Sequence, residues 1–225
     1  LYTNMGRYKE AEPLFLEAKL IWEKLLGKEN QHYLATLEGM AILFQETQQY
    51  ASAEAAFKEV LELQEKMLGK EDAFYARTLL NFATLYYTMD RNDLAEIRYL
   101  EAKSIYEKTL GKEHSEYAHC LHNLGNVYFM TGRKALAEAL FLETSRIWEK
   151  VLGKESSDYV NNLNGLAKTY ESSNRYAATD SILAEARTLQ HSLLTKATRH
   201  LSEYELAQYF KIFEYDIDNC LSYAW

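Results

Sequence analysis

The stretch EKLLGKENQHY, residues 23–33, contains a motif that recurs along the chain at a constant spacing. The motif, LGKE, begins at Leu26, Leu68, Leu110 and Leu152, so each step is 42 residues. In every copy a Glu-Lys pair stands just ahead of the motif, and a Tyr follows the glycine six positions later. A fixed period of this length indicates a chain built from stacked structural repeats.

Between the glycines, apolar residues follow the spacing of one helix face. Leu37, Met40, Ala41 and Phe44 stand at i, i+3, i+4 and i+7. The same positions recur in the later repeats as Leu79, Phe82, Ala83 and Tyr86, as Leu121, Leu124, Gly125 and Tyr128, and as Leu163, Leu166, Ala167 and Tyr170. We therefore expect a first helix in each repeat, near residues 33–47, 75–89, 117–131 and 159–173.

A polar turn follows each first helix, and a second apolar pattern begins after it. This pattern has a small position, which lets two helix backbones approach, and a large position, which fills the gap beside it. The small position holds Ala11, Ala53, Ala95 and Ala137, and the large one holds Phe15, Phe57, Tyr99, Phe141 and Leu183. The glycine of LGKE suits the left-handed conformation that ends a helix. We expect second helices near residues 8–25, 50–67, 92–109, 134–151 and 176–194.

The repeat pattern degrades towards the end of the chain. Thr195 stands where a fifth LGKE would have its glycine, so the last second helix lacks its usual stop and is expected to run on or break less sharply. We assign residues 1–194 to the repeat array and residues 195–225 to a capping or bridge helix with an apolar stripe through Leu206, Phe210 and Phe213. The predicted fold is an all-α solenoid of antiparallel helix pairs, with about ten or eleven helices.

This alternation of large and small anchors resembles the tetratricopeptide repeat. The repeat length and the stretch GRYKEAEPLFLEAKLIWEKLLGKEN, residues 6–30, resemble the kinesin light chain type and its bacterial relatives. The resemblance covers about residues 1–195 and implies a superhelix whose first helices line a concave, protein-binding groove. The chain departs from that type where two adjacent Asn are usual, because those positions read Glu38-Gly39, Leu80-Asn81, His122-Asn123 and Asn164-Gly165.

Composition excludes several classes of function. The net charge of −8 argues against binding to nucleic acid, which needs a basic surface. No apolar run reaches the roughly 18 residues that a membrane span requires. Two cysteines are too few for a disulfide framework and fit a reducing compartment, so we expect a cytoplasmic protein. Because the chain begins at Leu1 without a Met, a removed targeting segment stays open.

The sequence also contains no convincing catalytic or metal-binding motif. The chain has no phosphate-binding glycine loop, nucleophile elbow or paired-cysteine metal motif. His119, Cys120 and His122 lie too close in sequence for the i, i+4 metal pair of a helix, and helical neighbours point about 100° apart. We interpret Cys120 as a small packing residue and expect no enzymatic activity, no metal and no cofactor.

A further stripe on the first helices changes identity from repeat to repeat, unlike the anchors. In the first complete repeat it holds Ala35, Glu38 and Ile42. At about 100° per residue it points well over 90° from its own anchors, so we do not expect it to pack on the partner second helix. A polar stripe that varies in this way favours recognition of a ligand, and the alternative interpretation is a solvated polar face.

The resemblance places this stripe in the groove, where Asn81 and Asn123 match the family's second groove Asn. The candidate peptide-binding residues are Arg77, Asn81, Thr84, His119, His122, Asn123, Asn126, Asn161, Asn164 and Lys168. Asn and His side chains can both donate and accept hydrogen bonds, which suits reading a peptide backbone. Tyr87 and Phe129, one turn further on, are either apolar anchors for the ligand or packing residues.

Three hypotheses about function follow. The first is a scaffold that binds a peptide segment or partner domain. The second is a regulatory arm of a larger protein, because the residues LSE at Leu201–Glu203 and SYA at Ser222–Ala224 resemble the bridge of bacterial tetratricopeptide–CHAT proteins. That resemblance implies a caspase-like protease domain after residue 225, which would be a partner within the same polypeptide. The third is a self-assembling spacer.

Overall fold

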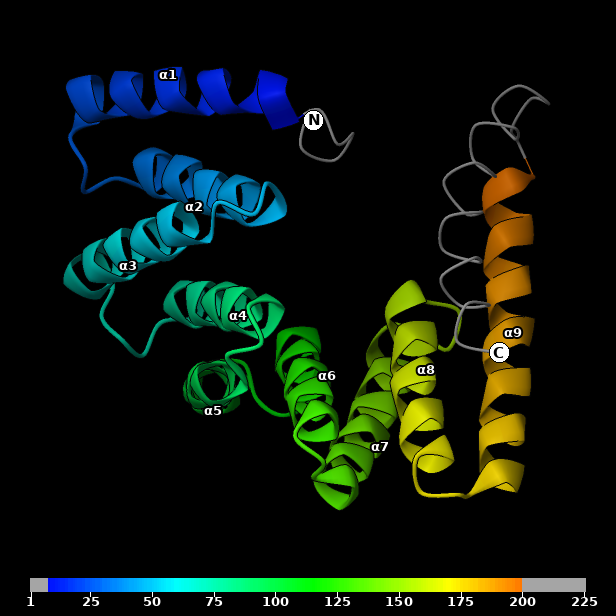
Figure 1. The fold of residues 1–225 in the computed structure, drawn as a ribbon. Coiled ribbons are helices and arrows are strands. Elements are labelled where there is room, and N and C mark those ends of the chain that lie inside the picture. The colour runs from blue at the N-terminus through cyan, green and yellow to red at the C-terminus, as the bar shows by residue number, and fades with distance from the viewer. Residues whose placement is uncertain (1–7, 200–225) are drawn as a thin grey trace.

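The computed structural model describes residues 8–199, and this part of the chain forms nine helices and no strand (Figure 1). The helices are α1 (Tyr8–Leu26), α2 (Gln31–Glu46), α3 (Tyr50–Met67), α4 (Ala73–Thr88), α5 (Asn92–Thr109), α6 (Ser115–Met130), α7 (Lys134–Val151), α8 (Ser157–Glu171) and α9 (Tyr176–Thr198). The predicted all-α fold is confirmed. The first seven residues of the predicted repeat array and the apolar stripe through Leu206, Phe210 and Phe213 lie outside the described residues.

The same capping position starts each first helix, which explains why all four begin two residues earlier than predicted. Asn30, Asp72, His114 and Ser156 stand 42 residues apart, and each side chain accepts a hydrogen bond from a backbone N–H of the first turn. Such caps satisfy amides that have no partner inside the helix. The helix therefore starts directly after the cap, and the repeated Tyr lies within its first turn.

Residues in the left-handed backbone conformation separate the helices. The glycines of LGKE adopt it as expected, with φ of +84° at Gly69 and +82° at Gly111. The turn inside each hairpin uses it too, although only Gly132 is a glycine there, and Gln48 and Asp90 have φ of 59° and 55°. At the fifth LGKE position Thr195 takes the place of glycine, and α9 continues through it to Thr198, beyond the predicted boundary at residue 194.

The helices pack as hairpins that follow one another along a curved stack (Figure 1). Each first helix pairs with the second helix after it, as in α2–α3 and α4–α5, and each second helix also contacts the next first helix. Successive first helices touch as well, in the pairs α2–α4, α4–α6 and α6–α8, whereas no pair of second helices within residues 8–199 makes contacts of comparable extent. Elements on the inner side of a curved stack approach each other more closely, so the first helices line its concave side.

The predicted anchors form the core between these layers. Ala53, Phe57, Leu79 and Leu121 are fully buried, and Phe57 stacks on Phe82 with ring centroids 5.6 Å apart. Phe15 and Leu183 are only partly buried, because each lies in a helix at an end of the described stack. Burial of large apolar side chains at every junction supplies most of the stability of such an array.

Candidate peptide-binding face

The candidate residues lie on α4, α6 and α8, at the places where successive first helices meet. Their surroundings differ from junction to junction, because the stripe changes identity while the backbone repeats. Within residues 8–199, the structure brings some of them together into hydrogen-bonded groups and leaves the side chains of Asn123, Asn161 and Asn164 outside these groups.

The junction between α2 and α4 is built around the carboxylate of Glu38. This residue is 8% exposed and forms an ion pair of 3.1 Å with Arg77. It also accepts hydrogen bonds from Asn81 Nδ2 at 3.0 Å and Thr78 Oγ1 at 3.5 Å. Two of the candidate residues, Arg77 and Asn81, are therefore joined through a third residue on the preceding repeat.

Two features of the predicted stripe need correction. Glu38 belongs to the stripe that we expected to face the groove, yet it is buried because donors from the next repeat close over it. Thr84 was not expected to reach its partner helix, yet its hydroxyl lies 2.9 Å from that of Tyr99 on α5. Helical spacing gives the direction of a side chain from its own axis, but not how closely a neighbouring helix approaches.

The junction between α6 and α8 holds a chain of amide and imidazole groups. Asn126 Nδ2 lies 3.1 Å from His122 Nε2, and His122 Nδ1 lies 3.0 Å from Asn162 Oδ1. Asn162 in turn donates to the backbone oxygen of Phe141 at 2.7 Å and to Ser145 Oγ at 2.8 Å. Asn162 is fully buried and connects α8 to the second helix α7, a role that its sequence position did not reveal.

This chain of contacts requires a neutral His122. Because Asn126 donates to Nε2, the ring must carry its proton on Nδ1, where it donates to Asn162. Burial lowers the pKa of His122, since a charged ring would lose its hydration, although the bond to Asn162 opposes this shift. Nearby His119 lowers the pKa further and Asp158 raises it.

The remaining candidates are more open. His119 packs edge-on against Trp148, with ring centroids 4.9 Å apart, and lies 3.8 Å from the carboxylate of Asp158. Asn161 is exposed, and Asn123 and Asn164 are partly exposed. Lys168 is exposed as well. Tyr87 and Phe129 both pack against buried core clusters, which favours the packing interpretation of these two rings.

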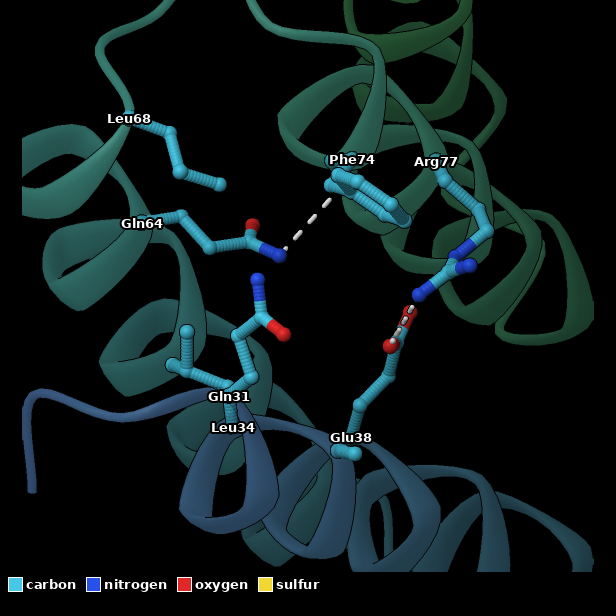
Figure 2. Close-up of a pocket in the computed structure, with 8 residues that line it drawn as sticks. Gln31, Leu34, Glu38, Gln64, Leu68, Phe74 and Arg77 are labelled. Atoms are coloured by element: carbon cyan, nitrogen blue, oxygen red, sulfur yellow. Dashed lines mark hydrogen bonds and ion pairs between the residues drawn. The ribbon is translucent and has the colours of Figure 1, made fainter. Parts of the chain in front are cut away.

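A cavity of about 200 Å³ lies at the N-terminal end of the candidate face (Figure 2). Its lining comes from α2, the end of α3 and the start of α4, and includes two residues of the first junction, Glu38 and Arg77. Gln31, Gln64 and Phe74 also line it. No sequence motif contains these three residues, and their types change between repeats.

The groups considered for catalysis have other roles. Cys120 is fully buried, its thiol donates to the backbone oxygen of Tyr99 at 3.0 Å, and burial raises the pKa of the thiol to about 12. The expectation of a packing residue is confirmed. Within residues 8–199 no three His, Cys, Asp or Glu side chains gather as metal ligands would. No helix in this part of the chain is long and apolar enough to cross a membrane.

Comparisons with known proteins agree with this architecture. The chain is similar to a solved structure of nearly identical TPR-like repeats of a kinesin light chain from Podosopora anserina, with 23% identity, a TM-score of 0.70, and 88% of this chain and 92% of that chain covered. It is also similar to BtubC (BKLC) from P. vanneervenii, with 16% identity, a TM-score of 0.75, and 85% and 76% covered. The chain matches no curated protein.

These structural similarities show the fold. A sequence model of the tetratricopeptide repeat also matches residues 1–66 and 74–150, which is more than half of the chain. The matched stretches include the LGKE glycines Gly27 and Gly111, whereas Gly69 lies between the two segments. The chain belongs to the tetratricopeptide repeat family.

Proposed function

We propose that the chain is a protein-binding scaffold that holds a segment of a partner along the concave face formed by α4, α6 and α8. Tetratricopeptide repeat proteins generally serve as protein–protein interaction scaffolds and are typically non-enzymatic. Curved repeat arrays present extended concave surfaces suited to such binding. The approach of successive first helices in this chain supports placing the surface on that side.

The observation that carries the proposal is a group of three asparagines, Asn123, Asn161 and Asn164, on two successive first helices. Within the described part of the chain, none of their side chains makes a hydrogen bond, and all three residues are at least partly exposed. A carboxamide offers both donors and an acceptor, so such side chains can bond a peptide group of a ligand. Arg77, His119 and Lys168 extend the same face with exposed or partly exposed side chains.

The other candidates have a different proposed role. Asn81, Thr84, His122 and Asn126 make hydrogen bonds inside the chain, to Glu38, Tyr99 and each other. In our proposal these residues set the spacing and orientation of the first helices, and the six more open residues contact the ligand. The face thus combines a rigid polar base with adaptable groups above it.

A peptide selection tests this proposal. Peptides selected against the folded chain from a random library are expected to bind the Asn123→Ala, Asn161→Ala double variant at least about tenfold more weakly, because two hydrogen-bonding groups are lost. Circular dichroism should show unchanged helicity. Ser104→Ala, at an exposed position of the second helix α5, is the matched control and should bind as the wild type does. Equal affinity of the double variant and the control would place the binding surface elsewhere.

The hypothesis of a regulatory arm stays a prediction. It rests on the resemblance of the tail to the bridge of tetratricopeptide–CHAT proteins, and those residues lie outside the described part of the chain. The proposed binding face is compatible with such an arm, because it needs only the helices from α2 to α8.

A further inference from the structure

A group of three side chains joins a second helix to the hairpin that follows it. Arg133, in the turn between α6 and α7, forms two hydrogen bonds of 2.7 Å with the carboxylate of Glu96 on α5. Its guanidinium also lies over the ring of Tyr128 on α6, 4.3 Å from the ring centroid. Because Glu96 belongs to the preceding second helix, this Glu–Arg–Tyr triad ties α5 to the hairpin of α6 and α7.

The same triad occurs at the two neighbouring junctions, shifted by 42 residues. The distances from Arg to Glu are 3.1 and 2.7 Å there, and the distances from Arg to the ring centroid are 4.8 and 4.1 Å. The residues are Glu54, Arg91 and Tyr86 at one junction, and Glu138, Arg175 and Tyr170 at the other.

These triads are suited to holding helices in place. A bond between guanidinium and carboxylate is stronger than a neutral hydrogen bond, and an aromatic face adds an attraction for the cation. The three glutamate side chains are only 20% to 28% exposed, which limits screening of the pair by water. The triads therefore stabilise three successive junctions, from α3 to α9.

The first junction lacks this triad. The equivalent positions hold Glu12 on α1, Phe44 on α2 and Gln49 in the turn after α2. Phenylalanine has no hydroxyl, and the uncharged Gln49 donates to Thr47 Oγ1 in its own turn, at 3.2 Å. In the part of the chain that the structure describes, Glu12 forms no ion pair with α2 or α3. Only the acidic member of the triad is thus present.

The helix α1 rests on α2 through side chains of its own that stay partly or fully exposed. Trp22 stacks on His32 with ring centroids 4.6 Å apart, and Tyr8 donates to Glu46 over a long 3.5 Å. Ala11 alone among the residues of α1 is buried, whereas α3, α5 and α7 each bury at least five residues. α1 therefore has both little burial and no triad to hold it against the array.

The connecting loops do not distinguish the first junction from the second. Both pass through the LGKE motif, with a φ of 77° at Gly27 and 84° at Gly69. A loop absorbs a rotation of the helix ahead of it only where side-chain contacts leave that helix free to move. Among the described junctions between a second helix and the next hairpin, the first is the one without a triad.

We propose that the first junction is a hinge, about which α1 swings away from α2 while α3 to α9 keep their packing. The triads hold the helices of the candidate face, α4, α6 and α8, in fixed positions. The array thus combines a rigid binding face with a movable helix at its N-terminal end (Figure 1). Opening uncovers the side of α2 where the ring of Phe15 lies against Gly39. This inference requires no ligand, so its test is independent of the test of the asparagine face.

Hydrogen exchange of the whole chain, followed by mass spectrometry, tests the hinge. A helix gains most of its stability from packing, so the amides of α1 exchange when it leaves α2. The Phe44→Tyr, Gln49→Arg double variant supplies the two missing members of a triad with Glu12. Amides of α1 should then exchange at least about tenfold more slowly than in the wild type, because the hinge opens less often.

Two further variants show whether the triad is the cause. The double variant in a Glu12→Ala background is the matched control and should exchange as the wild type does, because the acceptor is missing. The reverse change, Tyr170→Phe with Arg175→Gln, should speed exchange in α9 at least about tenfold. Unchanged exchange in either double variant would overturn the hinge. Slowing of α1 that persists with Glu12→Ala would also overturn it, since packing and not the triad would then hold α1.

Discussion

Glu38 of α2 and Arg77 of α4 form an ion pair of 3.1 Å between two successive repeats, 39 residues apart in the chain. The two partners differ in their surroundings, because the side chain of Glu38 is 10% exposed and that of Arg77 is 47% exposed. Asn81 and Thr78 donate to the same carboxylate. The buried partner therefore organises the junction, and the exposed partner remains available at its edge.

Replacing Glu38 is expected to be more damaging than replacing Arg77. Glu38→Ala leaves the donors of Asn81 and Thr78 without their acceptor and should cost roughly 1–3 kcal/mol of unfolding free energy. Arg77→Ala should cost less than Glu38→Ala, because Arg77 is 47% exposed and Asn81 and Thr78 still donate to the carboxylate after its removal. Phe57→Ala, which empties a fully buried site, should cost roughly 3–5 kcal/mol. Urea unfolding of the three variants checks this order, and a Glu38→Ala variant as stable as wild type would contradict it.

Phe141 of α7 limits the size of residue 165 on α8. A Cβ atom added at Gly165 would lie 2.9 Å from two ring atoms of Phe141, closer than real contacts allow. Gly165→Ala should therefore destabilise the fold by roughly 1–3 kcal/mol through overpacking, despite the better helix propensity of alanine. In a Phe141→Leu background the same change should become neutral or stabilising. Thermal unfolding of the four-member cycle measures the coupling, and additive effects would show that the ring does not set this limit.

His122 should make stability depend on pH. Its pKa is lowered in the fold, so the unfolded chain binds the proton more readily, and stability falls as the pH drops below the unfolded value of about 6.5. Protonation would also turn Nε2 into a donor facing the donor of Asn126. Unfolding free energies of the wild type at pH 7.5 and 5.5 should differ more than those of His122→Gln. The same pH dependence in both proteins would show that the ring is not titrating in this way.

Cys120 should resist alkylation in the folded chain. The thiol is fully buried and its pKa is raised to about 12, so the reactive thiolate is scarce near neutral pH. Iodoacetamide at pH 7.5 should label Cys120 slowly in buffer and rapidly in urea, as followed by mass spectrometry of its peptide. A Cys220→Ser variant keeps the second cysteine from contributing. Equal labelling rates in buffer and in urea would contradict the packing of this residue.

Local sequence signals determined the helices with good accuracy. The second helices α3, α5 and α7 have the predicted bounds, because a left-handed turn residue limits each of them at both ends. The first helices begin two residues early, since the prediction followed the repeated Tyr instead of the capping residue ahead of it. The anchors were also readable, because every repeat uses the same apolar positions and the core needs them for the same reason.

The period, the helix pairs and the buried anchors could all be predicted, because they depend on residues close together in the chain. The meetings of polar residues between repeats could not. Glu38 meets Asn81 and His122 meets Asn162 across separations of 43 and 40 residues. The cavity beside Gln64 could not be predicted from the sequence either. These relationships depend on how closely successive helices approach and on which side chains fill each junction, and a helical pattern within one repeat carries no information about either.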